Sequence, residues 1–197
     1  MLEFSCTDIS PEAGIDEAGR GCLAGPVVAA AVILPNGFTS NLLNDSKKLS
    51  ESQRLQVREQ ILAEAVCWGV GMISAQRIDE VNILNATYEA MHEAIASLQV
   101  SPHMLAIDGN RFRAYPDIPH RCEVKGDGRF LNIAAASVLA KTYRDELMAM
   151  LDKEFPQYGW AGNKGYPTKA HKVAIAEHGQ SPYHRLSFRA SLEPKKA

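Results

Sequence analysis

Carboxylate side chains stand next to glycine at three places in this sequence of 197 residues: Asp16 and Glu17 before Gly19, Asp108 before Gly109, and Asp127 between Gly126 and Gly128. Glycine allows a sharp turn and lets a ligand come close to the main chain. Four carboxylates that meet in one site raise one another's pKa values unless a cation neutralises them. Oxygen ligands without histidine or cysteine fit Mg²⁺ or Mn²⁺ rather than zinc. The pattern therefore predicts a site where divalent ions and phosphate meet, as in two-metal phosphoryl hydrolysis.

The first of these places, Asp16 to Gly21, carries two adjacent acids. Neighbouring side chains of a regular strand point to opposite faces, so Asp16 and Glu17 are expected to share a site only where their strand ends. Gly19 and Gly21 would provide that end. Taken alone, the window fits equally well an acidic turn that merely connects two strands, because short motifs match often by chance.

The hydrophobic pattern predicts five strands that alternate with helices and position these acids. The strands are expected at 14–17, 26–34, 66–73, 103–107 and 121–125, and the helices at 50–65, 82–98, 131–153 and 169–177. Alternation of this kind indicates an α/β fold, in which strand 26–34 returns antiparallel through the short glycine turn. Ligands of such sheets gather beyond the strand ends, so the acids are expected to converge there.

Three local signals support the helix assignments. Ser50 and Gln53 have the spacing of a capping box at the first helix. Apolar residues of 82–98 recur every three or four positions, which forms one buried stripe. The third helix opens with the small residues 134–137, which allow close approach to a sheet, and Thr168 is expected to cap the last helix.

Composition places the chain among globular proteins outside the membrane. Its apolar fraction is 46% and its charged fraction 22%, with no window of about 18 apolar residues that would span a bilayer. No basic region begins the chain, so no secretory signal is expected. The four cysteines are scattered, without a CxxC pair, which favours reduced thiols and a cytoplasmic location.

Charge is distributed unevenly along the chain. The net charge is −2, but residues 156–197 contain seven lysines and arginines against Glu177 and Glu193, a net charge of +5 that leaves −7 for residues 1–155. We therefore expect two parts: a body over 1–155, and a basic, helical C-terminal extension over 156–197. The asymmetry favours a polyanionic partner at the extension, although a solvated basic tail without a partner is the alternative.

Six motifs, in order along nearly the whole chain, resemble those of bacterial ribonuclease HII: Gly14-Ile15-Asp16-Glu17-Ala18-Gly19-Arg20-Gly21, Asn44-Asp45-Ser46-Lys47-Lys48-Leu49, Ile107-Asp108-Gly109-Asn110, Lys125-Gly126-Asp127, Ile133-Ala134-Ala135-Ala136-Ser137 and Lys164-Gly165-Tyr166-Pro167-Thr168. The resemblance implies an RNase H-like fold with a mixed five-stranded sheet, flanking helices and a small C-terminal helical extension. It also implies Mg²⁺- or Mn²⁺-dependent hydrolysis of RNA in RNA–DNA hybrids, and incision of duplex DNA 5′ to single ribonucleotides in ribonucleotide removal and repair. A monomer is expected.

The resemblance also implies roles for particular residues. Catalytic and metal-binding carboxylates would be Asp16, Glu17, Asp108 and Asp127. The backbone of Gly19, Arg20 and Gly21 would sense the ribose 2′-OH, a contact that separates RNA from DNA. The remaining substrate-binding residues would be Lys47, Lys48, Lys164, Tyr166 and Arg185. Two positions depart from the family pattern, Cys22 where proline is usual and Asn163 where histidine is common.

Other interpretations of these residues and of the whole chain remain open. Lys47 and Lys48 also fit a solvated turn, and Tyr166 alone would more often be a packing residue. His171, His178 and His184 lack metal-site spacing and are expected at the surface or near phosphates. A different nuclease of the same fold, such as a junction resolvase, would cleave all-DNA substrates. A non-catalytic hybrid-binding module would have no use for four converging carboxylates.

Overall fold

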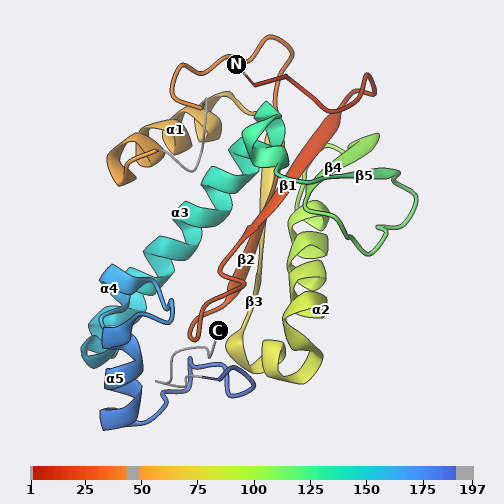
Figure 1. The fold of residues 1–197 in the computed structure, drawn as a ribbon. Helices are drawn as coiled ribbons and strands as arrows, with labels where there is room; N and C mark the ends of the chain where they lie inside the picture. Colours follow the sequence, from red (N-terminus) through yellow and green to blue (C-terminus); the bar gives the residue numbers. More distant parts are fainter. Residues whose placement is uncertain (1, 44–48, 190–197) are drawn as a thin grey trace, which may run out of the picture.

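The computed structural model describes residues 2–43 and 49–189, which form one mixed five-stranded sheet in the order β3-β2-β1-β4-β5 (Figure 1). The strands are β1 (Glu12–Ala18), β2 (Val27–Ile33), β3 (Cys67–Ile73), β4 (Met104–Asp108) and β5 (His120–Glu123). β2 pairs antiparallel with both β1 and β3, while β4 pairs parallel with both β1 and β5. The predicted fold class and the antiparallel return of β2 are confirmed.

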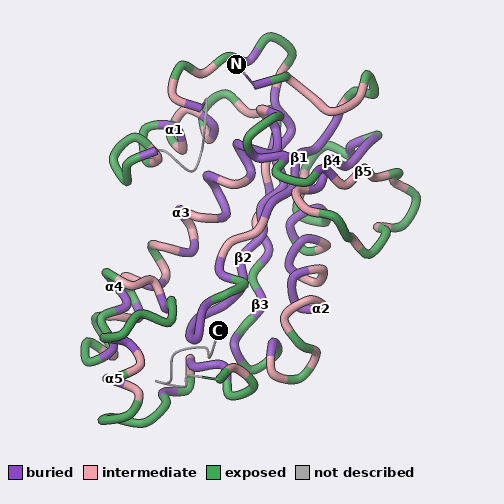
Figure 2. Tube along the Cα trace, viewed as in Figure 1, coloured by how far each residue is buried: buried purple, intermediate pink, exposed green. Residues whose placement is uncertain are grey.

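Helices cover both faces of the sheet. They are α1 (Glu51–Glu64), α2 (Ala75–Ala96), α3 (Leu131–Glu154), α4 (Trp160–Asn163) and α5 (Lys169–His178), with short 3₁₀ turns η2 (Gly126–Gly128) and η3 (Pro156–Tyr158). All seven residues of β2 are buried (Figure 2). Ala29 and Ala31 face the α2 layer, while Ala30 and Val32 face the α3 and α1 layer, so two apolar cores enclose the sheet.

Helix α3 lies against β1 at very short range. A Cβ atom added to Gly14 would come within 2.2 Å of the carbonyl carbon of Asn132, so only glycine permits this approach. Ala134, Ala135 and Ala136 are fully buried in the same layer. The prediction that small residues bring this helix close to the sheet is confirmed, and it explains how α3 side chains reach the acids of β1.

The predicted starts of α1 and α5 are confirmed, and each has the N-cap that the sequence predicts. Ser50 and Gln53 form the expected capping box of α1, and the Thr168 side chain caps α5. Helix α2 begins at Ala75, seven residues before the predicted start, but Asn82 interrupts it with φ 68°. The Asn82 side chain accepts hydrogen bonds from the backbone N–H groups of Leu84 and Asn85, so it acts as an internal cap where the sequence pattern begins.

The C-terminal elements η3, α4 and α5 pack on the far end of α3 (Figure 1). Met148 and Leu151 of α3 contribute to an apolar cluster with Tyr158, Trp160 and Ala174. Among the described residues, no helix is long and apolar enough to cross a membrane.

Candidate active site

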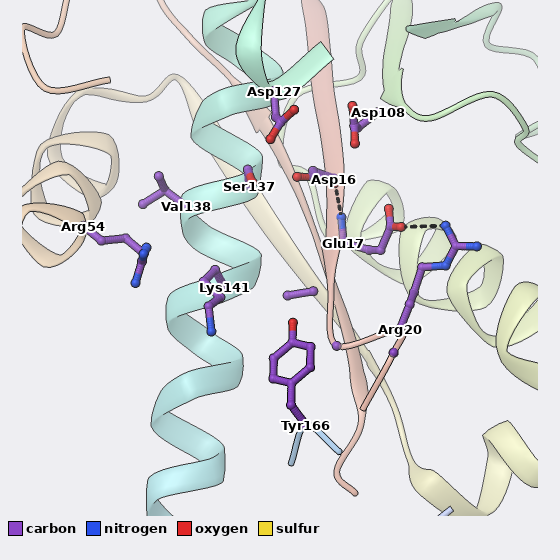
Figure 3. A pocket seen from close by; sticks show the side chains of 13 residues that line it. Asp16, Glu17, Arg20, Arg54, Asp108, Asp127, Ser137, Val138, Lys141 and Tyr166 are labelled. Carbon is purple, nitrogen blue, oxygen red and sulfur yellow. Dashed lines mark hydrogen bonds and ion pairs between the residues drawn. The ribbon is translucent and has the colours of Figure 1, made fainter. Parts of the chain in front are cut away.

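A pocket of about 460 Å³ lies where β1 runs past the end of β4. The β1–β4 register stops at Ile15 and Ile107, so the following residues of β1 border open space on that side. The pocket is lined by Asp16, Glu17, Ala18, Gly19, Arg20, Gly21, Arg54, Asp108, Asp127, Ser137, Val138, Lys141 and Tyr166. All four predicted carboxylates therefore line one pocket (Figure 3).

Asp16 and Glu17 reach this pocket in a way the sequence did not indicate. The strand does not end between them, because β1 continues to Ala18 and both residues keep regular partners on β2. Asp16 faces α3 and Glu17 faces the opposite side, toward Arg20 (Figure 3). Both line the pocket because it wraps around the free edge of β1 beyond β4.

Asp108 and Asp127 approach from the neighbouring segments. Asp108 is the last residue of β4, and one of its carboxylate oxygens accepts a hydrogen bond of 2.7 Å from the backbone N–H of Gly126. That bond ties the end of β4 to η2, which carries Asp127. The glycines beside these acids are thus part of the turn that brings two carboxylates to one side of the pocket.

The pocket concentrates negative charge in a buried place. Burial raises the pKa of Asp16 well above its usual range, and the nearby Glu17 and Asp108 carboxylates raise it further. Burial likewise raises the pKa of Glu17, which its ion pair with Arg20 partly offsets. Such a site favours a cation, because a bound cation relieves the repulsion between carboxylates.

The donor set fits Mg²⁺ or Mn²⁺. Every candidate ligand is a carboxylate oxygen, the donor type that these hard cations prefer. Within residues 2–43 and 49–189, no three acidic, histidine or cysteine side chains are arranged tightly enough to enclose an ion by themselves. Mg²⁺ is ordinarily held by one or two carboxylates, with water and substrate phosphate as its other ligands, so an open arrangement is what this ion requires.

The turn after β1 is held from behind by a buried arginine of the C-terminal extension. Arg185 is 1% exposed and donates hydrogen bonds to the carbonyl oxygens of Gly19, Arg20 and Gly25. It is therefore placed under the turn, not on the pocket surface where a substrate-binding role would put it. Because Arg185 occupies the carbonyl groups on the inner side, it supports the turn in its present conformation.

A second buried arginine, Arg144 of α3, continues this support. It donates hydrogen bonds to the carbonyl oxygens of Ala24, Pro26 and Lys164. The Arg144 side chain also fills the space beside Gly19, where an added Cβ would lie 2.0 Å from its Nε atom. Gly19 adopts φ +94°, so its conformation and its surroundings both require glycine.

The other predicted substrate-binding residues lie in several places. Tyr166 is 42% exposed and points its hydroxyl into the pocket toward the acids (Figure 3). Lys164 lines a smaller pocket of about 160 Å³ between α1 and α3, next to Arg54. Lys47 and Lys48 lie outside the described residues. Arg20, Glu17 and Asp108 also line a third pocket of about 350 Å³ on the α2 side, so the hollow continues past the acids.

The two departures from the family pattern have structural roles. The Asn163 side chain donates to the Tyr158 carbonyl oxygen and accepts from the Gly165 N–H, so it shapes the chain on either side of Lys164. Cys22 is fully buried, and burial raises the pKa of its thiol.

Sequence reasoning missed three polar residues that line the pocket, Arg54, Ser137 and Lys141. The Ser137 hydroxyl forms a hydrogen bond with Asp16 that lowers the pKa of this carboxyl against the larger effect of burial. Lys141 pairs with Asp145 at 2.5 Å and stands one helical turn after Ser137. That spacing of four residues puts Ser137 and Lys141 on one face of α3, which was the available signal.

The fold and the carboxylate pocket together define a nuclease with an RNase H-like fold. Ribonuclease H2 from Pyrococcus horikoshii superposes with a TM-score of 0.75 at 24% identity, covering 91% of this chain and 94% of that one. RNase HII in its complex with PCNA from Archaeoglobus fulgidus gives a TM-score of 0.74 at 27% identity, covering 94% and 97%.

Sequence comparison gives the family. The family model described as ribonuclease HII matches residues 13–191. Ribonuclease HII of Bacteroides thetaiotaomicron is 62% identical over 177 residues, which cover 90% of this chain and 88% of that protein. This chain belongs to the ribonuclease HII family. It is a ribonuclease H, a divalent-metal-dependent endonuclease that acts on RNA–DNA hybrids.

Proposed function

We propose that this enzyme incises duplex DNA on the 5′ side of embedded single ribonucleotides, as well as cutting the RNA strand of hybrids, and leaves 5′-phosphate and 3′-hydroxyl ends. The observation that carries the proposal is the juxtaposition of four carboxylates with a glycine turn and a tyrosine in one pocket. Incision of this kind serves ribonucleotide removal during DNA replication and repair. We place the enzyme in the cytoplasm as a monomer.

Asp16, Glu17, Asp108 and Asp127 would hold two divalent ions, Mg²⁺ or Mn²⁺. Bound in pairs, such ions supply an activated water and stabilise the leaving oxygen. The chain's own contribution is to fix the carboxylates: Ser137 orients Asp16, and the backbone of Gly126 orients Asp108. Lys141 and Arg54 line the α3 side of the pocket, where positive charge suits the phosphates that flank the reacting one.

Discrimination for ribose would come from the turn of Gly19, Arg20 and Gly21 together with Tyr166. The inner carbonyl groups of the turn are taken up by Arg185, and Gly19 and Gly21 line the pocket. A site built to satisfy a hydroxyl penalises a substrate that lacks it, because polar groups of the site are then left unpaired. Tyr166 would pack against the nucleotide that follows the ribose.

The basic extension, residues 156–197, is proposed to contact the phosphate backbone. Its helix α5 carries Lys169 and Lys172 at exposed or half-exposed positions. We keep the division proposed from charge, a catalytic part over 1–155 and the extension over 156–197. The extension also completes the site, since Lys164, Tyr166 and Arg185 all belong to it.

The deciding experiment compares Tyr166→Ala with the wild type on two substrates, a duplex with one embedded ribonucleotide and a hybrid with a continuous RNA strand. We expect a rate loss of about 100-fold on the single ribonucleotide, because without Tyr166 the scissile phosphate would be misplaced relative to the carboxylates. The loss on the RNA strand should be smaller, because neighbouring 2′-OH groups offer other registers. Equal losses on both substrates would remove Tyr166 from ribose discrimination, and cleavage of all-DNA duplex would favour another nuclease activity.

A further inference from the structure

Two histidines form a buried relay behind the pocket. His171 on α5 is 0% exposed and His184 is 2% exposed, so the expectation that they lie at the surface or near phosphates is wrong. Their Nε2 atoms are 3.1 Å apart, and their rings pack against Tyr158 and Trp160. No local pattern could indicate this pairing, since the two histidines are 13 positions apart in the sequence.

The hydrogen bonds of the relay determine where its protons are. The backbone N–H of Ser181 donates to His184 Nδ1 at 2.9 Å, so the proton of a neutral His184 ring is on Nε2. Trp160 Nε1 donates to His171 Nε2 at 3.0 Å, so His171 carries its proton on Nδ1. His184 Nε2 then shares the single lone pair of His171 Nε2 with Trp160, and His171 Nδ1 donates to the Tyr166 carbonyl oxygen at 2.9 Å. The Ser181 hydroxyl also lies 2.9 Å from His184 Nδ1. With both rings neutral, each donor of this scheme has an acceptor.

The segment that carries His184 also holds the glycine turn. His184 forms an isolated bridge with Ala24, and the next residue, Arg185, binds the carbonyl oxygens of Gly19, Arg20 and Gly25. One dipeptide is therefore linked to both parts of the pocket, to the turn through Arg185 and to the Tyr166 backbone through His184 and His171.

We propose that His184-Arg185, together with His171, is the positioning unit that sets Tyr166 and the glycine turn at the correct separation for a ribonucleotide. The inference deepens the proposed function and rests on it. None of these three residues touches the substrate. Their role is to hold two backbone segments that come from opposite ends of the chain.

Acid should release this unit. A further proton on His184 Nδ1 would displace the Ser181 N–H and have only the Ser181 hydroxyl as acceptor, and one on His171 Nε2 would face the Trp160 and His184 donors. Burial lowers the pKa of His171, and burial together with the His171 ring lowers that of His184 to about 4. A neutral buried histidine stabilises the fold fully above its unfolded pKa of about 6.5, and this stabilisation is lost as the pH falls toward the folded value.

The other ionisable groups near the relay are engaged elsewhere or exposed. The elements packed against the rings are η3, α4, α5 and residues 179–185. The Tyr158 hydroxyl donates to the Gly179 carbonyl oxygen, and the Arg185 guanidinium faces the glycine turn. Tyr183 packs on Trp160. The ionisable side chains of α5 at exposed or half-exposed positions are Lys169, Lys172, Glu177 and His178.

The first test is ¹⁵N NMR of the histidine rings in the full-length wild type, with signals assigned through single His→Asn variants. We expect His171 as the Nδ1–H tautomer and His184 as the Nε2–H tautomer at pH 7.5. His184 should remain neutral at pH 5.5, and His171 should titrate below the ordinary histidine pKa. Opposite tautomers, or protonation of either buried ring near pH 6.5, would overturn the relay whatever the enzyme's substrate preference is.

The second test is kinetic and uses the same two substrates as Tyr166→Ala. His171→Leu should lose about tenfold more rate on a single ribonucleotide than on an RNA strand, since small displacements of a reacting group are costly. His171→Asn, whose amide can replace the Nδ1 donor, should recover most of that loss, and His178→Leu on the same helix should match the wild type. Arg185→Lys keeps the charge but not the forked contacts, and should behave like His171→Leu.

The outcomes separate the two proposals. If Tyr166→Ala discriminates between the substrates while His171→Leu and Arg185→Lys do not, the positioning unit is wrong and the proposed function stands. If Tyr166→Ala itself does not discriminate, the role proposed for Tyr166 in ribose discrimination fails, and the NMR experiment still decides the relay. Should His171→Leu not fold, Arg185→Lys decides: reduced discrimination at an unaltered melting temperature would support the inference, and wild-type discrimination would oppose it.

Discussion

Arg20 Nη1 lies 3.0 Å from Glu17 Oε1, so the exposed arginine of the glycine turn forms an ion pair with one of the proposed metal ligands. The Arg20 side chain is 51% exposed and that of Glu17 is 12% exposed. Both residues line the main pocket and the neighbouring pocket on the α2 side. Arg20 therefore occupies a carboxylate that a divalent ion would otherwise use.

Removing the charge of Arg20 should ease metal binding. In Arg20→Gln the Mg²⁺ concentration for half-maximal activity should fall by about two- to fivefold, since exposed ion pairs contribute at most about 1 kcal/mol. The KM for substrate should rise, because a positive group beside the phosphates is lost. Metal titration at saturating substrate measures the effect, and Arg20→Lys, which keeps the charge, is the control. An unchanged metal dependence would show that the ion pair does not compete.

Asp108→Asn should abolish cleavage while leaving substrate binding intact or tighter. The amide keeps the shape of the side chain but removes a ligand charge and relieves repulsion with Asp16. A rate loss of about 10³-fold is expected, which corresponds to about 4 kcal/mol of transition-state stabilisation. Single-turnover rates and binding titrations measure the two effects separately. Asp117→Asn, at an exposed turn, is the matched control. Turnover near the wild-type value at saturating Mg²⁺ would remove Asp108 from the mechanism.

The two glycines of the turn should respond differently to alanine. Gly19→Ala imposes a side chain at φ +94° and against Arg144, so the free energy of unfolding should fall by about 1–3 kcal/mol. Gly21→Ala places its Cβ in open space, so the free energy of unfolding should change by less than about 0.5 kcal/mol. Since Gly21 lines the pocket, its variant should instead raise KM. Denaturant unfolding and steady-state kinetics test the pair, and equal stabilities would contradict the assignment.

Salt dependence should reveal whether the extension meets the phosphate backbone. Deleting the extension would also remove Arg185 from behind the turn, so a double substitution, Lys169→Gln with Lys172→Gln, is cleaner. Each lost phosphate contact lowers the magnitude of the slope of log affinity against log salt by about 0.9. The slope of the double variant should therefore be smaller than that of the wild type by up to about 1.8. Arg121→Gln on β5, away from α5 in Figure 1, is the control. An unchanged slope would mean that α5 does not contact the duplex.

The sequence predicted the sheet and most helix boundaries because those signals are local. Apolar runs, the Ser50 capping box and the Thr168 cap depend on residues that are close together in the sequence, so they can be recognised without knowledge of the fold. The predicted start of α2 was seven residues too late. The apolar stripe begins at the internal cap Asn82, while the first part of the helix, residues 75–81, lies before it. The resemblance to a family, rather than periodicity, supplied the grouping of the four acids.

What sequence could not supply is the tertiary position of polar side chains. The resemblance assigned Arg185 to substrate, yet it is buried beneath the turn, because its hydrogen-bond partners are carbonyl groups of a segment far away in the sequence. His171 and His184 were misplaced for a similar reason, since their partners come from different segments. Asp16 and Glu17 share a pocket through an open edge of β1 that depends on where another strand stops.

The contact between Arg185 and the glycine turn has a consequence for biosynthesis. A chain emerging from the ribosome carries all four acids proposed to be catalytic once residue 127 has been made, and domains generally begin to fold from the N-terminal side during synthesis. The guanidinium that fixes Gly19 arrives 166 residues after the turn itself. A nascent or prematurely terminated chain thus has its carboxylates before it has a rigid turn, so a fragment that ends before Arg185 should be a poor nuclease rather than an indiscriminate one.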